Sequence, residues 1–249
     1  MAVENTKTIM EICLLAGRIM MEGGAETYRV EDTMTRIAAS FGMEETHCFV
    51  TPTGIFMSLN GDNPSQLVRI NVRTTDLEKV ARVNQISRRI AAGEFTVKDA
   101  KDAFEDLEAS HLLFPISLQI LAAALVSGSF LIMFKGGWTD FLPAIIAGGL
   151  GYCGLLFIQH YTKVKFFAEF FAAFIIGIVT LVMVNLGIGK ELDKIIIGSV
   201  MPLVPGLLIT NAVRDLMAGH FVSGLSKGAE AFLTAFAIGA GVAVVFLSW

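Results

Sequence analysis

The sequence predicts a mainly α-helical membrane protein, in which a small α+β domain (residues 1–110) precedes a transmembrane domain of five spans (residues 111–249). Three observations support this fold class. Hydrophobic residues make up 54% of the 249 residues and the mean hydropathy is +0.64, whereas soluble domains contain roughly 45–50% apolar residues. Residues 1–110 carry 29 of the 42 charged side chains, and residues 111–249 carry only 13. The net charge of −4 leaves no basic footprint for a nucleic acid partner.

The first 110 residues show helical periodicity, then strand alternation, then helical periodicity again. Apolar residues recur at helical spacing between positions 9 and 20, and Gly23–Gly24 is expected to end that helix. A second helix is predicted over Glu26–Phe41. Three short antiparallel strands are predicted over Thr46–Thr51, Gly54–Leu59 and Gln66–Arg73, with a turn at residues 61–64. Two further helices are expected to begin at capping boxes, Thr75 with Glu78 and Thr96 with Asp99.

Four apolar segments of the second part are long enough to cross a bilayer, which takes about 20 residues of helix. They are Ile116–Phe134, Phe141–Ile158, Phe166–Leu186 and Ala229–Ser248. A helix is expected for each, because lipid offers no partners to exposed backbone groups and the segments lack the alternation of barrel strands. Small residues recur four apart in two of them, at Ala144/Gly148, Ala147/Gly151 and along Ala231, Ala235, Gly239 and Ala243. Such rows serve packing within the chain or contact with another subunit.

The remaining span, residues 195–222, is expected to be discontinuous. Pro202 and Pro205 each remove a backbone donor and clash with the preceding turn, and Gly206 loosens the chain further. We therefore expect the helix to break at Pro202–Gly206 and a second half-helix to start near Gly206. The amides at its start carry partial positive charge, and interrupted spans of this kind are typical of transporter sites.

The second half-helix is polar on one side, where Thr210, Asn211, Arg214 and Asp215 project. These four residues, with Pro202, Pro205 and Gly206, are the predicted substrate-binding or translocation residues. Arg214 is expected either to pair with Asp215 or to attract an anionic substrate, because a lone arginine in a membrane is costly. The alternative is an interfacial helix whose charged groups reach the membrane surface.

Two acidic residues, Glu169 and Glu230, lie within predicted spans, each near one end. Each either reaches the interface or acts as a proton-coupling carboxylate. The histidines and cysteines show no ligand spacing, and no nucleophile–base pair or phosphate-binding loop is found. We therefore expect no metal, no cofactor and no enzymatic activity.

The orientation is indicated by the flanking basic residues. With the N-terminal domain inside, the inner ends of the spans carry six Lys or Arg and the outer ends carry three. The expected location is a cell membrane, crossed several times, with the N-terminal domain in the cytoplasm.

Several segments resemble the bacterial threonine/serine exporter family: Gly24–Asp32 (GAETYRVED), Thr51–Phe56 (TPTGIF), Pro205–Asp215 (PGLLITNAVRD), Ser223–Gly224 and Glu230–Ala231. The resemblance implies a half-length member, equivalent to the first of two five-span halves, that works with a small integral-membrane second subunit. It points to Pro205, Gly206, Asn211, Arg214, Asp215 and Glu230. Two positions depart from the family pattern: Lys227, where arginine is common, and His220, where an acid is frequent.

Together these features predict a subunit of a secondary transporter that exports a small anionic or zwitterionic metabolite. Threonine, serine and a dicarboxylate such as succinate all fit, and an oligomeric assembly in the bilayer is expected. The hypothesised mechanism is alternating access around the broken span, coupled to a proton or to the membrane potential. The alternative is a membrane-anchored ligand-binding sensor or scaffold without transport activity.

Overall fold

The structure is a computed structural model and describes residues 2–59, 65–110, 113–162 and 164–247. The chain forms two compact units. The first comprises Met1–Leu113 together with Leu207–Gly228, and the second comprises Phe114–Gly206 together with Ala229–Trp249. The segment Leu207–Gly228 comes from the part of the chain that we expected to belong to the transmembrane domain alone. The turn expected at residues 61–64 lies outside the described residues.

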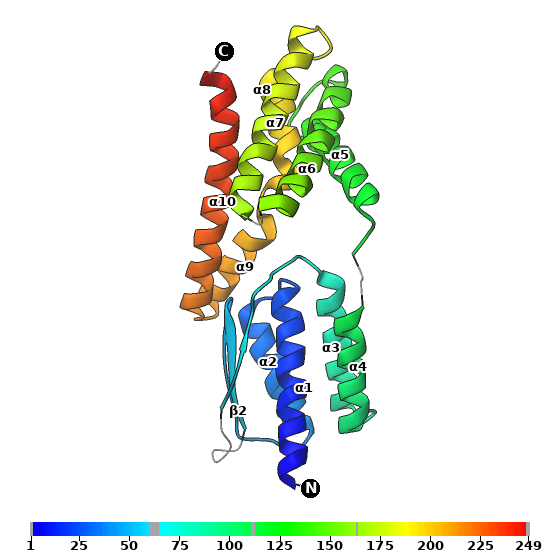
Figure 1. Cartoon of the computed structure of the whole chain (residues 1–249), viewed down its shortest axis with the longest axis vertical. Coiled ribbons are helices and arrows are strands. Elements are labelled where there is room, and N and C mark those ends of the chain that lie inside the picture. Colours follow the sequence, from blue (N-terminus) through cyan, green and yellow to red (C-terminus); the bar gives the residue numbers. More distant parts are fainter. Residues whose placement is uncertain (1, 60–64, 111–112, 163, 248–249) are drawn as a thin grey trace. The chain divides into compact units, whose positions relative to one another are not determined.

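The first unit contains the predicted helices and strands of the N-terminal domain (Figure 1). Its elements are α1 (Ala2–Glu22), α2 (Thr27–Ser40), β1 (Thr46–Thr51), β2 (Gly54–Leu59), β3 (Gln66–Arg69), α3 (Leu77–Ala91) and α4 (Val97–Ala109). The strands pair antiparallel in the order β1-β2-β3, as the alternating pattern predicted.

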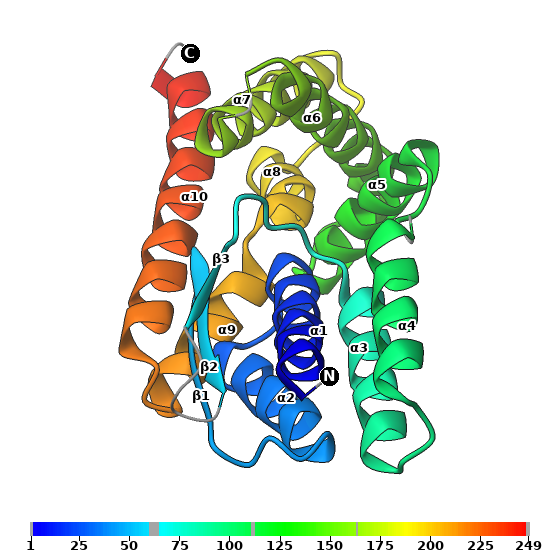
Figure 2. The same ribbon diagram turned by 60° about the horizontal axis from the view of Figure 1, so that its bottom comes forward.

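The most deeply buried element of this unit is α1, which packs against α2, α3, α4 and β2 (Figure 2). Its apolar residues Ile9, Ile12 and Met20 are almost completely excluded from solvent. Gly24 ends the helix with φ +89°, and its N–H bonds to the carbonyl of Met21. The expected glycine end of this helix is therefore confirmed.

Two local predictions in this unit need correction. The third strand ends at Arg69 rather than Arg73, because the chain leaves β2 after Ile70 donates a hydrogen bond to the carbonyl of Thr53. Asp76, not Thr75, caps α3 by accepting from the N–H of Lys79. A carboxylate one position later is an equally good cap, which spacing alone does not resolve. The capping box of Thr96 with Asp99 is confirmed.

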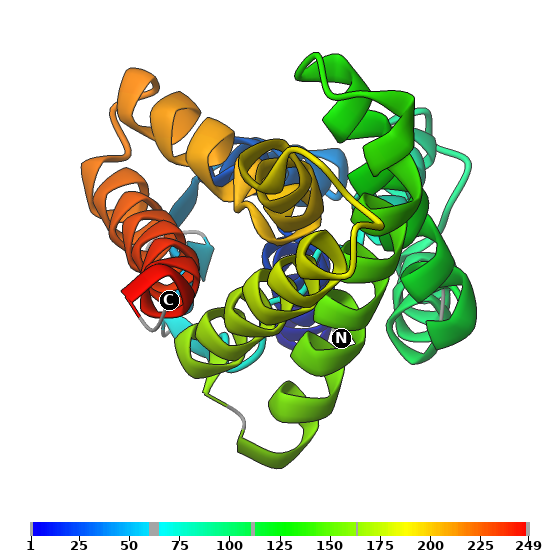
Figure 3. The ribbon, with the colours of Figure 1, turned by 90° about the horizontal axis from the view of Figure 1, so that it is seen from above.

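The second unit is a bundle of helices (Figure 3). Its elements are α5 (Ile116–Met133), η1 (Trp138–Asp140), α6 (Phe141–Thr162), α7 (Lys165–Asn185), α8 (Leu192–Val200), η2 (Met201–Leu203) and the part of α10 (Phe221–Leu247) from Ala229 onward. The short helix α8 packs against α5, α6 and α7. Asp140 is buried and accepts from the N–H groups of Lys190 and Glu191, which fixes the loop before α8.

Among the described residues, four helices have the length and hydropathy to cross a membrane. They are Ile116–Met133, the continuous stretch Trp138–Thr162, Lys165–Asn185 and Phe221–Leu247. The fifth candidate is a broken pair, Leu192–Leu203 with Gly206–Met217. Helix η2 ends at Leu203, Val204 is extended and α9 (Gly206–Met217) follows Pro205. The predicted break at Pro202–Gly206 is therefore present. The last helix begins at Phe221, eight residues before the predicted Ala229. The prediction missed its first two turns because they contain Ser, Lys and Gly and are less apolar than the rest of the helix.

Small residues hold the helices of the second unit close together. A side chain at Gly148 would overlap with the Ser127 hydroxyl of α5, and one at Gly151 would overlap with Ile176 of α7. The rows Ala144/Gly148 and Ala147/Gly151 therefore serve packing within the chain. The row on α10 divides differently, because Ala231 is buried whereas Ala235, Gly239 and Ala243 are exposed.

Candidate functional site

The segment Leu207–Gly228 folds as a helical hairpin made of α9 and the start of α10, here called the α9–α10 hairpin. Gly219 ends α9 with φ +86°, and the N–H of His220 bonds to the carbonyl of Asp215. Gly224 brings α10 against α9, since a Cβ there would lie 2.6 Å from Cγ of Leu216. Gly219 and Gly224 thus set the geometry of this hairpin.

Asp215 is the most buried polar group of the hairpin, with none of its surface exposed. Its Oδ1 accepts from the N–H of Thr27 at 2.9 Å, and its Oδ2 accepts from the Thr27 hydroxyl at 2.9 Å. Lys227 Nζ donates to the same Oδ2 at 2.8 Å and to the carbonyl of Ala25 at 3.1 Å. Because Thr27 is the first residue of α2, the carboxylate also lies at the positive end of a helix dipole.

Two more residues of α9 extend this contact. Asn211 donates from Nδ2 to the carbonyl of Gly24 at 2.8 Å, and Arg214 NH1 donates to Oε1 of Glu26 at 2.5 Å. We call the set Gly24, Glu26, Thr27, Asn211, Arg214, Asp215 and Lys227 the Asp215 cluster. It joins two sequence segments that lie almost 190 residues apart.

Glu26 lies between two arginines within the Asp215 cluster. Burial raises the pKa of its carboxyl group, but a hydrogen bond from its own backbone, one from Arg214, and the charges of Arg29 and Arg214 outweigh that effect. The net result is a pKa below the ordinary value of 4.5. Glu26 is therefore ionised at neutral pH, and Arg29 reaches its other oxygen at 3.2 Å.

The predicted site residues separate into three places. Asn211, Arg214 and Asp215 come together in the Asp215 cluster, whereas Pro202, Pro205 and Gly206 mark the break before α9. Thr210 is exposed, and its hydroxyl donates to the carbonyl of Leu207.

The pairing considered for Arg214 with Asp215 is wrong. Adjacent residues on a helix point in different directions. The Arg214 side chain is 60% exposed and bonds to Glu26, while the Asp215 side chain is completely buried and bonds to Lys227.

The opposite face of the α9–α10 hairpin is apolar and open. Its exposed large side chains are Leu207, Ile209, Val213, Met217, Phe221, Val222 and Leu225. A polar face that binds protein and an apolar face that remains exposed are typical of a helix that lies at or in a bilayer.

Glu169 and Glu230 belong to the second unit, on α7 and α10. Glu230 pairs with Lys165 at 2.8 Å. Glu169 is 5% exposed, and its Oε2 has no hydrogen-bond partner among the described residues. No group of three or more His, Cys, Asp or Glu side chains within the described part of the chain is arranged to hold a metal ion.

Sequence reasoning did not predict the contacts that Lys227, Thr27 and Glu26 make with α9. The available signal was the position of Glu26 and Thr27 inside the family-like segment Gly24–Asp32, and the presence of a lone lysine at the start of an apolar helix. Helix periodicity describes one helix at a time, so it did not reveal that these segments meet.

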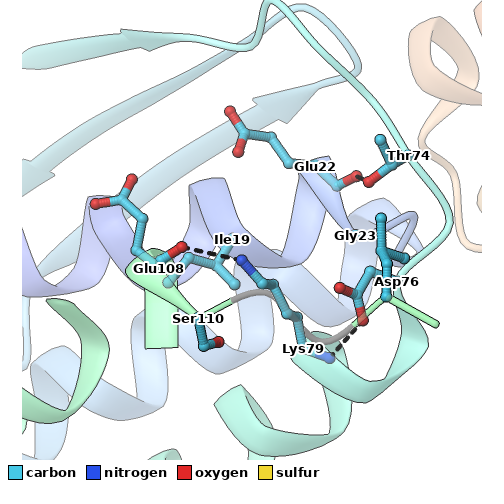
Figure 4. A pocket seen from close by; sticks show the side chains of 9 residues that line it. Ile19, Glu22, Gly23, Thr74, Asp76, Lys79, Glu108 and Ser110 are labelled. Atoms are coloured by element: carbon cyan, nitrogen blue, oxygen red, sulfur yellow. Dashed lines mark hydrogen bonds between the residues drawn. The ribbon is translucent and has the colours of Figure 1, made fainter. Parts of the chain in front are cut away.

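A small cavity of the first unit lies where α1 meets α3 and α4 (Figure 4). Its volume is about 140 Å³, below the roughly 300–1,000 Å³ of usual ligand pockets. Lys79 Nζ, drawn among the lining residues, donates to the carbonyl of Glu108, and Asp76 accepts from the N–H of Lys79. Because these polar groups are hydrogen-bonded to one another, we interpret the cavity as a packing gap between helices rather than a ligand site.

A family model described as "Putative threonine/serine exporter" (ThrE) matches residues 11–248. The chain belongs to the threonine/serine exporter family. This family is one of transporters rather than enzymes, and with its several apolar helices the chain is a multi-pass membrane protein. No solved structure matches the chain significantly.

Three relatives differ in how much of their own length this chain covers. A "Probable threonine/serine exporter" of Mycobacterium tuberculosis is 26% identical over 93% of this chain and 44% of its own length. The "Threonine/serine exporter" of Corynebacterium glutamicum is 22% identical over 94% of this chain and 50% of its own. A "Probable succinate transporter subunit YjjP" of Klebsiella aerogenes is 23% identical over 98% of this chain and 95% of its own. The chain thus spans about half of the named threonine/serine exporters and nearly all of the succinate transporter subunit.

Proposed function

We propose that this chain is one subunit of a secondary transporter that exports a small hydrophilic metabolite, with threonine, serine and a dicarboxylate such as succinate as the candidate substrates. The observation that carries the proposal is the interruption of the apolar segment 192–217 at Val204–Pro205 in a chain of this family. The start of α9 is the positive end of its helix dipole, which favours a substrate carboxylate at this position.

The Asp215 cluster gives the N-terminal domain a role in this function. Asn211, Arg214 and Asp215 tie α9 to the start of α2. Any displacement of α9 during transport therefore moves the N-terminal domain with it. We place that domain in the cytoplasm, in a bacterial plasma membrane protein, and the basic residues at the helix ends support this orientation.

The partner is a small integral-membrane subunit. The support for a second subunit is that relatives matched over nearly their full length are named as subunits of a succinate transporter. The exposed small residues Ala235, Gly239 and Ala243 offer α10 as the contact, because they allow a helix to approach closely in lipid.

The test is a flux measurement in membrane vesicles that contain this chain and the partner subunit, with labelled serine, threonine and succinate. Efflux of at least one compound that depends on both subunits is the expected result. The absence of flux for all three, together with binding of one of them by the chain, would instead assign it to a sensor.

Arg214→Ala tests the role of α9. If Arg214 attracts the anionic end of the substrate, flux falls by at least about tenfold while the protein remains inserted. Arg36→Ala is the matched control, because Arg36 pairs with Asp32 on α2 and lies outside the Asp215 cluster. Equal flux in the two variants would leave Arg214 with a purely interfacial role.

A further inference from the structure

Two polar atoms in the second unit lack partners, and they lie side by side. Among the described residues, the buried side-chain atoms without a hydrogen-bond partner are Oε2 of Glu169 and the hydroxyl of Thr234. Glu169 is 5% exposed and Thr234 is 1% exposed. The Thr234 hydroxyl lies beside the Glu169 carboxyl group, so an orphan acceptor and an orphan hydroxyl from α7 and α10 face each other.

Other buried polar groups of the same unit are satisfied. The hydroxyl of Thr180 on α7 donates to the carbonyl four residues earlier at 2.8 Å, as does that of Ser127 on α5. Asp140 accepts from two backbone N–H groups. The unsatisfied state of Glu169 and Thr234 is therefore a local feature of these two residues.

A second pair lies one helical turn away from them. Lys165 precedes Glu169 by four residues on α7, Glu230 precedes Thr234 by four residues on α10, and the two side chains form an ion pair at 2.8 Å. The Lys165 and Glu230 side chains are 46% and 17% exposed, so this pair is the more accessible one. The ammonium group of Lys165 contacts Glu230 directly, whereas it acts on Glu169 only through its charge.

These contacts favour a proton over a metal ion as the ligand of Glu169. Hard metal cations take six or more oxygen ligands, and the unpartnered donors here are one carboxylate oxygen and one hydroxyl. A bound proton needs only one donor and one acceptor, and it removes the cost of an ionised carboxylate in an apolar site. Ala168 and Ala172, the neighbours of Glu169 along α7, are also buried.

We propose that Glu169 is a proton-binding site whose state decides the partner of Lys165. When Glu169 is protonated, its O–H bonds to the Thr234 hydroxyl and Lys165 pairs with Glu230, so that α7 is tied to α10. When Glu169 releases its proton to water, its carboxylate draws Lys165 along α7 and away from Glu230, which loosens the contact between the helices. The inference deepens the proposed export function, on which its role in coupling rests: a proton enters as a metabolite leaves.

The proton site can be measured without transport. N,N′-dicyclohexylcarbodiimide modifies protonated carboxyl groups in apolar surroundings, and peptide mass spectrometry locates the label. We expect the full-length protein in detergent to be labelled at Glu169 and not at Glu230, with less labelling as the pH rises from about 5 to about 9. Glu169→Gln removes the label. Labelling of Glu230 in preference to Glu169, or labelling of Glu169 that does not change with pH, would overturn the proposal.

The competition for Lys165 gives a sharper comparison. Glu230→Gln frees Lys165 for Glu169 and should lower the labelling rate of Glu169 by roughly threefold to tenfold, whereas Lys165→Met should raise it. Thr234→Val removes the hydroxyl partner and should change the pH dependence. Thr180→Val is the matched control, because it removes a buried hydroxyl of α7 that bonds only to its own backbone. An equal effect of the two threonine variants, or no effect of Glu230→Gln, would refute the exchange of partners.

Transport separates this inference from the proposed function. In vesicles with the partner subunit, Glu169→Gln should keep exchange of labelled for unlabelled substrate and lose the response to an imposed pH gradient. If the wild-type protein transports no substrate, the proposed function is refuted, whereas the labelling experiment still tests proton binding by Glu169. A Glu169→Gln variant that still responds to the gradient refutes Glu169 as the coupling site.

Discussion

At the scale of single residues, the first unit contains a buried ion pair between Asp215 and Lys227. Both side chains are at least 95% buried, and Thr27 supplies two further hydrogen bonds to the carboxylate. Removing one member of such a pair leaves an uncompensated buried charge, which is far more costly than the loss of an exposed pair.

Lys227→Met should therefore lower the free energy of unfolding by about 3–5 kcal/mol. The measurement is chemical denaturation in detergent micelles, followed by circular dichroism. The double variant Lys227→Met with Asp215→Asn should recover part of the loss, because no lone charge remains. Arg214→Met is the control and should cost about 1 kcal/mol or less, since that side chain is 60% exposed. A larger loss for Arg214→Met than for Lys227→Met would contradict this ranking.

The Glu26–Arg214 pair predicts a pH dependence. The folded protein lowers the pKa of Glu26, so the pair adds stability above the ordinary value of 4.5, and this contribution disappears as the pH falls through the folded pKa. Glu26→Gln should cost about 1 kcal/mol or less at about pH 7, and the cost should be smaller at about pH 3. Denaturation of both proteins at the two pH values checks it, and a difference that grows on acidification would be the opposite sign.

The residues of the Asp215 cluster show how far a sequence leads. Asn211, Arg214 and Asp215 were identified from the polar side of one helix, which depends only on helical spacing. Their partners Glu26, Thr27 and Lys227 lie on other elements. Periodicity carries no information about contacts between distant segments, so the function of this polar side as a binding face for α2 emerged only with the fold.

At the scale of elements, the long helices and the three strands were predictable because each has a regular apolar pattern or a strong breaker. The break before α9 followed from Pro202, Pro205 and Gly206. The errors lie at ends, such as the last strand and the start of α10, where tertiary contacts and polar first turns override the pattern.

The glycine contacts between α5 and α6 predict a strong effect of one methyl group. Gly148→Ala should lower the free energy of unfolding by about 1–3 kcal/mol, because the new Cβ overlaps with the Ser127 hydroxyl. Ser127→Gly in the same protein should restore most of it. Gly239→Ala is the control, since a Cβ there meets no heavy atom within 4 Å. Thermal unfolding in detergent compares the three, and equal losses for Gly148→Ala and Gly239→Ala would disprove the packing argument.

At the scale of the whole molecule, the relatives named as transporter subunits and the exposed face of α10 support an assembly. Ala235, Gly239 and Ala243 lie four residues apart on a surface that no other part of the described chain covers. The chain itself thus leaves room for a helix of another subunit.

Gly239→Leu should reduce co-purification of the small membrane subunit at least several-fold, because a large side chain prevents close helix approach. Phe236→Leu is the control, because Phe236 is also exposed on α10 and the substitution replaces one large side chain with another. Pull-down from solubilised membranes measures both. Undiminished recovery of the partner with Gly239→Leu would move the interface to another helix.

The α9–α10 hairpin has one more consequence, for anyone who wishes to study the N-terminal domain alone. A fragment that stops at Leu113 loses the carboxylate that neutralises the start of α2 and the amide that covers Gly24. This fragment should therefore be less stable than the same residues are in the full-length protein. Joining Leu207–Gly228 to this fragment through a flexible linker should restore its stability. A stable fragment of this protein therefore combines two segments that are distant in the sequence.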